Sequence, residues 1–304
     1  SLIRNAKAIR KYSAAAYTGR YEFETISVSS PFEHVLHVEI NRPDVSNAMN
    51  KDMLHELLEC FSRVQDDQHC RAVVISGTGK HFSAGLDFND MKEMVNKLSS
   101  KGGSDEMSQM DAARKAKFIR SMILMFQESF TSLEKCGKPV ICAINGACIS
   151  AGLAIATAAD IRYCSQDAFF QLKEVDVGMA SDMGQLQRLP LVIGNESLMN
   201  ELVFTARKMP ANEAKEMGLV SKVFGDGETT KQAAIEMARL IASKSPVAVQ
   251  GSKNCLKHCR DLSVADGLKY VANWNMVMLQ SIDFTRSLTI QSAKGDEIPV
   301  YSDL

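Results

Sequence analysis

The sequence predicts an α/β fold, because strand-like runs alternate with segments of helical apolar spacing. Predicted strands at 35–40, 72–76 and 140–144 are separated by predicted helices at 51–65 and 117–133. The composition agrees, since 304 residues with 45% hydrophobic and 23% charged side chains can bury a sizeable core. Periodicity alone does not select one α/β fold among those known.

Each further element is predicted from its local pattern. Residues 35–40 alternate like a strand, which the Asn41-Arg42-Pro43 sequence ends. A polar Gly/Ser stretch at 99–104 predicts either a mobile loop at the mouth of a pocket or an exposed linker. The other predicted elements are, in order, a helix at 88–98, short strands at 161–164 and 169–172, helices at 186–189, 197–204, 211–217, 231–242, 247–258 and 264–279, and one strand among these helices at 220–224.

The most informative part of the chain is residues 146–182. It opens with small and apolar residues and has no charge before Asp160, which predicts a helix buried on every side. Ser150, Ala151 and Gly152 at its start allow another molecule to approach free backbone N–H groups closely. Such donors, aided by the helix dipole, can hold a developing oxyanion.

Three carboxylates follow in otherwise apolar surroundings, namely Glu174, Asp176 and Asp182. Desolvation raises the pKa of a carboxyl group toward neutrality, which suits it to proton transfer. Asp176 lies two positions after Glu174, so on an extended segment both side chains point the same way. We expect only a structural hydrogen bond for Asp176. Gly178 permits a turn that lets Glu174 and Asp182 face one narrow cleft.

A second glycine-bearing turn follows the strand predicted at 72–76 and reads HFSAGLD from His81 to Asp87. Two separate loops would then each offer one backbone N–H to a single carbonyl oxygen. His81, at the start of this turn, is expected to be structural rather than catalytic.

Several motifs share one order along about residues 30–285: Asn41-Arg42-Pro43 with Asn47-Ala48-Met49, Phe82-Ser83-Ala84-Gly85-Leu86-Asp87, Lys138-Pro139-Val140 with Asn145-Gly146, Ala159-Asp160-Ile161-Arg162, and Gly218-Leu219-Val220. Jointly they resemble the crotonase superfamily, also called the enoyl-CoA hydratase/isomerase family. Residues 169–178 together with Ser181-Asp182 look most like its dienoyl-CoA isomerase branch.

This resemblance implies a crotonase-like spiral of ββα units followed by a helical C-terminal region that mediates trimerisation. The implied parts are a basic N-terminal extension at 1–28, a spiral core at 29–225 and a helical region at 226–304. Family trimers commonly pair into hexamers, so we expect a homo-oligomer, a trimer or a dimer of trimers. The apolar residues at 274–279 either form such an interface or pack on their own subunit.

The resemblance also implies a reaction, the isomerisation of 3,5-dienoyl-CoA to 2,4-dienoyl-CoA thioesters in fatty-acid β-oxidation. The backbone N–H groups of Leu86 and Ala151 match the family's oxyanion donors, and Glu174 and Asp182 match its proton-transferring acids. The residues matched to the substrate and its coenzyme A are Asp44, Ser46, Ala48, Ala84, Gly85, Leu86, Asp87 and Gly152.

One position departs from the family pattern. Ala154 stands where the branch, and the enoyl-CoA hydratases, carry a third acid. A methyl group cannot orient water, so hydration of 2-enoyl-CoA is disfavoured. A 3-enoyl-CoA to 2-enoyl-CoA isomerase using Glu174 alone stays an alternative, as does a weakly active or non-catalytic CoA-binding paralogue.

Other functions are disfavoured by composition. A net charge of −1 without a basic patch argues against nucleic acid, including the RNA bound by some crotonase-fold proteins. No apolar stretch has transmembrane length. No metal, flavin or nicotinamide motif occurs, and the eight cysteines read as buried free thiols, so we expect no metal and no cofactor beyond the substrate's coenzyme A. A metal site at Cys255, His258 and Cys259 is disfavoured for lack of a second ligand pair.

The sequences at the two ends of the chain bear on the cellular compartment of the protein. Residues 1–20 carry five basic side chains, Arg4, Lys7, Arg10, Lys11 and Arg20, and no acidic one, which is typical of a mitochondrial presequence remnant, although a basic surface arm has the same composition. The C-terminal residues resemble a peroxisomal tripeptide, but Asp303 replaces its basic residue. We therefore expect a mitochondrial protein, with the peroxisome as the alternative.

Overall fold

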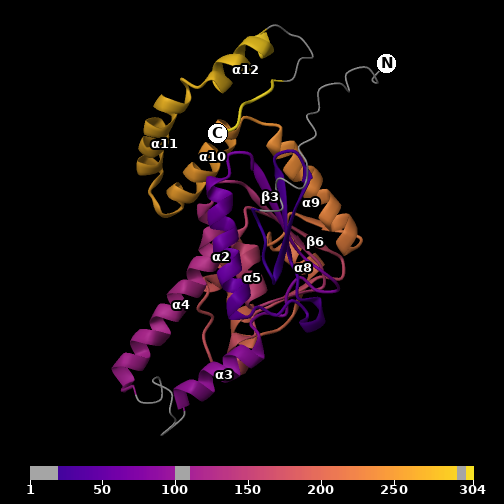
Figure 1. The fold of residues 1–304 in the computed structure, drawn as a ribbon, viewed down its shortest axis with the longest axis vertical. Helices are drawn as coiled ribbons and strands as arrows, with labels where there is room; N and C mark the ends of the chain where they lie inside the picture. The colour runs from indigo at the N-terminus through magenta and orange to yellow at the C-terminus, as the bar shows by residue number, and fades with distance from the viewer. Residues whose placement is uncertain (1–19, 100–109, 293–298) are drawn as a thin grey trace.

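The computed structural model describes residues 20–99, 110–292 and 299–304 and has a mixed α/β fold, as the sequence predicts (Figure 1). Its main sheet has six strands in the order β1-β2-β3-β4-β6-β9, and all neighbouring strands are parallel except β1 and β2. These strands are β1 (Ile26–Phe32), β2 (Val35–Ile40), β3 (Ala72–Gly77), β4 (Val140–Ile144), β6 (Ile161–Ser165) and β9 (Lys222–Phe224).

A second, smaller sheet has the order β5-β7-β8, with strands β5 (Ala147–Ile149), β7 (Phe169–Gln171) and β8 (Met209–Pro210). The chain passes from the large sheet to the small one twice, from β4 to β5 and from β6 to β7. The turn after β3 likewise reaches the small sheet, because Ser83 forms a bridge with Cys148 of β5. This repeated passage from the large sheet to the small one, followed by a helix, is the spiral that the family resemblance implies.

Helices cover both faces of the main sheet, with α9 on one face and α2 and α4 on the other (Figure 1). The protein has two hydrophobic cores, one on each face of the main sheet, and alternate residues of β3 pack into each. Val73 and Ile75 lie in the larger core, and Ala72 and Val74 lie in the smaller core beneath α9. The helices are α2 (Lys51–Asp66), α3 (Phe88–Ser99), α4 (Ala112–Lys135), α5 (Ala151–Ala158), α6 (Gln185–Arg188), α7 (Glu196–Thr205), α8 (Ala211–Glu216), α9 (Gly227–Ala242), α10 (Pro246–His258), α11 (Val264–Met278) and α12 (Ile282–Ser292).

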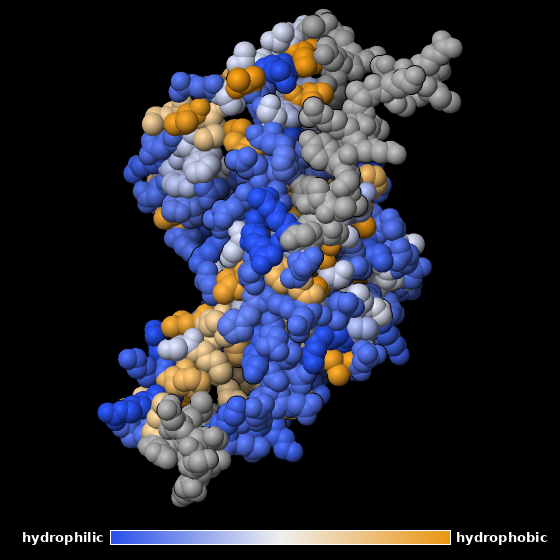
Figure 2. All heavy atoms as spheres, viewed as in Figure 1, coloured by the Kyte–Doolittle hydropathy of each residue, from blue (hydrophilic) through white to orange (hydrophobic). Residues whose placement is uncertain are grey.

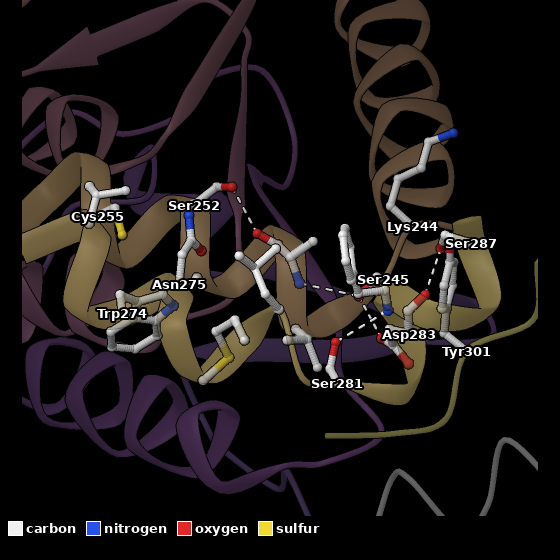
Figure 3. Close-up of a pocket in the computed structure, with 17 residues that line it drawn as sticks. Lys244, Ser245, Ser252, Cys255, Trp274, Asn275, Ser281, Asp283, Ser287 and Tyr301 are labelled. Carbon is white, nitrogen blue, oxygen red and sulfur yellow. Dashed lines mark hydrogen bonds between the residues drawn. The ribbon is translucent and has the colours of Figure 1, made fainter. Parts of the chain in front are cut away.

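Two ends of the molecule extend away from this core (Figure 1). At one end α3 and α4 project together, and apolar residues gather over them in the space-filling view (Figure 2). At the other end α10, α11 and α12 surround a cavity of about 430 Å³, lined in part by Trp274 and Tyr301 (Figure 3). Within the described ranges no helix combines the length and apolarity needed to cross a bilayer.

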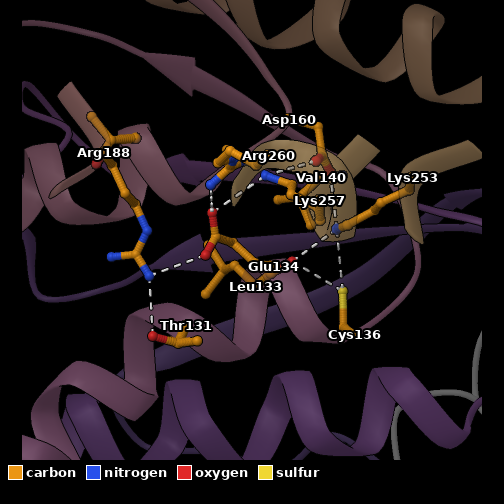
Figure 4. Close-up of polar contacts among 12 residues, drawn as sticks. Thr131, Leu133, Glu134, Cys136, Val140, Asp160, Arg188, Lys253, Lys257 and Arg260 are labelled. Carbon is orange, nitrogen blue, oxygen red and sulfur yellow. Dashed lines mark hydrogen bonds and ion pairs between the residues drawn. The ribbon is translucent and has the colours of Figure 1, made fainter. Parts of the chain in front are cut away.

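A polar cluster joins the C-terminal helices to the core (Figure 4). The buried ammonium of Lys253 on α10 donates to the carbonyls of Leu133 and Lys138 at 2.8 and 2.7 Å and pairs with Asp160 at 2.9 Å. Glu134, at the end of α4, receives Lys257 and Arg260 from the C-terminal helices. Because each buried charge has a partner, this junction fixes α10 against α4 and β4.

Several boundaries differ from those predicted. The small-residue helix begins at Ala151, as predicted, but residues 147–149 before it pair with β7 as the strand β5, which was not predicted. The pair Met209–Pro210 is a second strand beyond Gly184, and neither β1 nor α12 was predicted. The 99–104 stretch falls largely outside the described residues, as does the basic N-terminal extension up to residue 19.

The expectation that the Asp176 side chain points the same way as that of Glu174 is wrong. Residues Glu174–Val177 form a 3-10 turn rather than an extended segment, so positions two apart do not point the same way. Gly178 closes this turn with φ +78°, the left-handed conformation that glycine adopts most easily.

Candidate active site

The glycine turn after β3 is fixed by backbone hydrogen bonds on two sides. Ser83 donates its N–H to Ala147 at 2.9 Å and accepts from Ile149 at 3.0 Å, which joins the turn to β5. Met49 donates to the Gly85 carbonyl and accepts from the Asp87 N–H, so this bridge leaves the N–H of Leu86 unused. Gly85 has φ +96°, and a Cβ there would lie 3.2 Å from the Ile149 carbonyl oxygen.

The second donor lies at the start of α5. The N–H of Ala151 is in the first helical turn, where no intrahelical acceptor exists. Leu86 and Ala151 line the same pocket, together with Ala84, Ile149 and Ser150. The structure therefore brings both predicted backbone donors to one cavity, beside the two predicted acids, Glu174 and Asp182.

The two oxygens of Glu174 have different surroundings. Oε1 accepts from the Ser181 hydroxyl at 3.2 Å and from the Gln185 amide at 3.3 Å. Oε2 is buried and has no hydrogen-bond partner among the described residues. Burial raises the pKa of Glu174, and the charge of Asp182 adds to the rise, whereas the nearby Ser150 and Ser181 side chains lower it. Among the described residues, Oε1 of Glu174 is therefore the hydrogen-bonded oxygen and Oε2 is the one with open acceptor positions.

Asp182 is held mainly through its backbone. Its carbonyl accepts from the Gln127 amide on α4 at 2.7 Å, and Gly184, with φ +96°, turns the chain two residues later. Burial raises the pKa of the Asp182 carboxyl group, which is about half buried. This acid lines both the pocket of Glu174 and a neighbouring groove.

That groove runs between α3 and α4 and has a volume of about 380 Å³. Most of its lining is apolar, and methionine is frequent: Met49, Leu54, Leu86, Met91, Met94, Phe118, Ile119, Met122, Ile123, Phe126, Met179 and Met183. Its charged lining residues are Lys51, Asp87, Asp90, Glu93, Lys97 and Asp182. A long flexible apolar ligand fits such a lining, because methionine side chains adapt to irregular shapes.

The residues matched to coenzyme A fall into two groups. Ala84, Gly85, Leu86 and Asp87 belong to the turn beside the pocket, whereas Asp44, Ser46 and Ala48 form a loop behind it. The Ser46 carbonyl accepts from the Ala84 N–H at 2.9 Å, which ties the loop to the turn. Asp87 is engaged within the protein, since its carboxylate pairs with Arg42 at 2.9 Å.

Gly152 and Ala154 lie inside the protein rather than on the pocket wall. A Cβ on Gly152 would meet the Ser83 side chain at 3.2 Å, so this glycine permits close packing of α5 on the turn. Ala154 is completely buried. His81 is engaged within the protein, because its Nδ1 accepts from the Ala147 N–H at 3.1 Å.

Sequence reasoning missed the polar side chains that hold the acids. Gln127, Ser181 and Gln185 all contact the segment from Glu174 to Asp182. Gln127 lies 55 positions away in sequence and carries no motif, so only the tertiary arrangement reveals its role. Ser181 and Gln185 lie within three positions of Asp182, so their closeness in the sequence could have suggested that they contact the acids.

Comparisons with known proteins identify the family of this chain. A family model described as enoyl-CoA hydratase/isomerase matches residues 32–123 and 105–289. A Homo sapiens protein named Delta(3,5)-Delta(2,4)-dienoyl-CoA isomerase, mitochondrial, is 53% identical over 268 residues, covering 88% of this chain and 79% of its own. An Arabidopsis thaliana protein of the same name, but peroxisomal, is 42% identical over 260 residues, covering 86% and 90%. A crystal structure of an enoyl-CoA hydratase from Bacillus anthracis superimposes with a TM-score of 0.79 at 27% identity, covering 92% and 99%.

Proposed function

Because the chain belongs to the enoyl-CoA hydratase/isomerase family, we propose that it isomerises 3,5-dienoyl-CoA to 2,4-dienoyl-CoA thioesters in fatty-acid β-oxidation. Relatives named for this reaction are 52–54% identical over at least 88% of the chain. The observation that carries the proposal is the placement of two carboxylates, Glu174 and Asp182, along one pocket that also receives two backbone N–H donors.

The thioester carbonyl binds between the N–H groups of Leu86 and Ala151. Removing a proton from C2 places negative charge on this oxygen, and the two donors stabilise that charge as it develops. One such donor contributes about 3 kcal/mol to the transition state. The rest of the enolate is delocalised over the conjugated chain as far as C6.

The two acids divide the proton transfer. Glu174 lines only the pocket of the oxyanion donors, whereas Asp182 also lines the apolar groove, so Asp182 lies farther along the acyl chain. Glu174 Oε2 takes the proton from C2, the electrons shift along the chain, and Asp182 gives a proton to C6. The turnover leaves Glu174 protonated and Asp182 ionised, so before the next cycle Glu174 gives up its proton and Asp182 takes one up.

The part of the acyl chain beyond C6 occupies the groove between α3 and α4. Its methionine and phenylalanine lining excludes water without imposing one shape. This mechanism uses backbone N–H groups and carboxylates, and we expect no cofactor apart from the coenzyme A that the substrate itself carries. The loop from Asp44 to Ala48 remains our candidate for contacts with coenzyme A.

The alternative with a specific observation in its favour is a 3-enoyl-CoA isomerase. Only Glu174 has donors fixed on its carboxyl group, and the fully buried Ala154 supplies no third acid. A single carboxylate moves a proton between neighbouring positions and needs no help from Asp182. Hydration of 2-enoyl-CoA is disfavoured for the same reason, because it needs two acids to hold one water.

We also propose that copies of the chain associate through the C-terminal helices into a trimer or a dimer of trimers. Exposed apolar side chains are concentrated there, including Val264 at 82% and Ile282 at 76% exposure. The same three helices, α10, α11 and α12, enclose a cavity lined in part by Val271, Met278 and Leu279 (Figure 3). Light scattering at micromolar concentration tests this, and a stable monomer would contradict it.

By its mitochondrial relatives we place the protein in the mitochondrion, with the peroxisome as alternative.

One experiment separates these functions. The protein is incubated in turn with 3,5-dienoyl-CoA, 3-enoyl-CoA and 2-enoyl-CoA while the ultraviolet absorbance of the conjugated thioester is followed. We expect rapid formation of 2,4-dienoyl-CoA, slower turnover of 3-enoyl-CoA and no hydration. Turnover of 3-enoyl-CoA alone would establish the alternative, and no turnover of any substrate would leave a binding protein.

A further inference from the structure

Ser150 has a backbone conformation that a residue with a side chain rarely adopts. Its φ is +48° and its ψ is −106°, although it is not glycine. Such a conformation is unfavourable for a residue with a Cβ and persists only where its surroundings enforce it. Serine often begins a helix by capping it, yet the Ser150 side chain makes no capping hydrogen bond to α5. Helix capping therefore does not explain a serine here.

Every polar group of Ser150 instead bonds to the segments around Glu174. Its N–H donates to the Gln171 carbonyl at 2.8 Å, at the end of β7. Its hydroxyl oxygen accepts from the Lys173 N–H at 3.2 Å, one residue before Glu174. Its carbonyl accepts from the Gln185 amide nitrogen at 3.0 Å.

The contact with Gln185 fixes which end of that amide faces Glu174. Gln185 is completely buried, and the same nitrogen that donates to the Ser150 carbonyl lies 3.3 Å from Glu174 Oε1. A reversed amide would place its oxygen against the Ser150 carbonyl oxygen, which is unfavourable. The amide therefore presents a donor to Glu174, and a donor favours an ionised carboxylate.

We propose that Ser150 is a positioning residue for Glu174, which uses its strained backbone and its hydroxyl to hold Oε1 and to leave Oε2 free toward the substrate. This inference rests on the proposed function, because it assumes that Glu174 is the base. The hydroxyl hydrogen of Ser150 is free to donate toward Glu174, since the Lys173 N–H occupies an oxygen lone pair. Consistently, the Ser150 side chain lowers the pKa of Glu174.

The test uses two substitutions at Ser150 and one elsewhere. Ser150→Gly removes the hydroxyl and relieves the backbone, and Ser150→Ala removes the hydroxyl but keeps the strain. Ala206→Gly is the matched control, because Ala206 has φ +51° at the end of α7 and does not line the pocket of Glu174. The readouts are thermal unfolding, kcat and KM for 3,5-dienoyl-CoA against pH, and the ¹³C NMR titration of Glu174.

We expect Ser150→Gly to unfold at a temperature no lower than the parent, as Ala206→Gly does, while its kcat falls about 10-fold or more. Losing a donor to the carboxylate raises the pKa of Glu174, so the acidic limb of the rate profile should move to higher pH in both Ser150 variants. KM should change little. If Ser150→Ala does not fold, Ser150→Gly alone decides.

Two results would overturn the proposal. One is an unchanged kcat and an unchanged Glu174 titration in Ser150→Gly. The other is a loss of activity with a raised KM and no shift in the titration, which would mean that the substitution only distorted the oxyanion turn. An inactive parent protein would instead count against the proposed function, while the NMR titration would still report on Ser150.

Discussion

The two walls of the pocket are built differently. The inner wall, made by β5, α5 and the segment from Glu174 to Asp182, rests on a helix whose residues are all buried and mostly Ala or Gly. The outer wall, made by α3 and α4, presents methionines and phenylalanines, and Phe88 at its edge is 67% exposed. The inner wall is joined by many short backbone hydrogen bonds, whereas the outer wall packs largely through flexible side chains.

This difference matches the two tasks of an isomerase acting on acyl chains. Proton transfer depends on donors and acids held within a fraction of an ångström, which close-packed small residues provide. Acyl tails vary in length and shape, so their wall has to deform, as methionine-rich surfaces do. Substitutions on the inner wall should therefore affect every substrate alike, and substitutions on the outer wall should discriminate by chain length.

The largest effects should come from the acids of the inner wall. We expect Glu174→Gln and Asp182→Asn each to lower kcat for 3,5-dienoyl-CoA about 10²–10⁴-fold, since each removes a positioned acid or base. Binding of the CoA ester should be spared, which isothermal titration with the product measures. On 3-enoyl-CoA only Glu174→Gln should be crippling.

The same pair of variants can contradict the assignment. If Asp182→Asn is nearly silent on both substrates, Glu174 works alone and the 3-enoyl-CoA isomerase reading is correct. If neither substitution slows isomerisation, proton transfer lies with other residues.

The outer wall should give a smaller and selective effect. We expect Met122→Trp to lower kcat/KM for a long-chain dienoyl-CoA about 10–100-fold, because the indole fills part of the groove. A substrate that ends at C6 should be turned over normally. Leu124→Trp is the control, since Leu124 lies on the same helix but is 45% exposed and outside the groove lining. Equal losses for long and short substrates would show that the two walls are not independent.

Much of this arrangement could be predicted from the sequence, and the errors have physical reasons. The buried strands at 72–77 and 140–144 were recognisable because both faces of a parallel strand are apolar. Residues 147–149 were not separated from α5, since a three-residue strand of Ala, Cys and Ile has the composition of the helix that follows. The edge strand β1 was missed because its alternation spans only residues 26–29 and is ended by Ser30 and Pro31.

Parts of the candidate site could also be predicted from the sequence, and other parts could not. Leu86, Ala151, Glu174 and Asp182 were identified from motifs, and the structure gathers all four at one pocket. The groove could not be predicted, because it arises where α3 and α4 approach each other in space. The role of Gln127 and Gln185 depends on donor–acceptor geometry that no local pattern encodes.

A third prediction asks whether the inner wall tolerates a new acid. Ala154→Asp places a carboxyl group at a completely buried position on α5, which should lower the free energy of unfolding by about 1–3 kcal/mol. If the third acid of the family acts on the substrate, dienoyl isomerisation should change in rate, and weak hydration of 2-enoyl-CoA should appear. Ala154→Asn separates the effect of volume from that of charge, and an unchanged rate in Ala154→Asp would show that the third acid is dispensable. Measurable hydration by the parent protein would mean that another residue replaces it.

The smallest expected effect concerns the stability of the folded protein against pH. Burial raises the pKa of both Glu174 and Asp182 in the folded state. A carboxyl group with a raised pKa binds its proton more tightly when the protein is folded than when it is unfolded. Stability therefore falls as the pH rises from the usual carboxyl range, near about 4, through the folded-state pKa. Above that value both acids are ionised within the wall that excludes water.

Neutral side chains of the same shape remove this dependence. We expect the double variant Glu174→Gln, Asp182→Asn to unfold at a temperature higher than the parent by less than about 4 °C at pH 7. The difference should shrink as the pH is lowered toward about 4, where the parent's acids are protonated too. Exposed Glu22→Gln is the control and should show no such trend. An equal gain in unfolding temperature at both pH values would show that burying the two charges does not destabilise the folded protein. The inner wall would then differ from the outer wall in its rigidity and not in the desolvation of its acids.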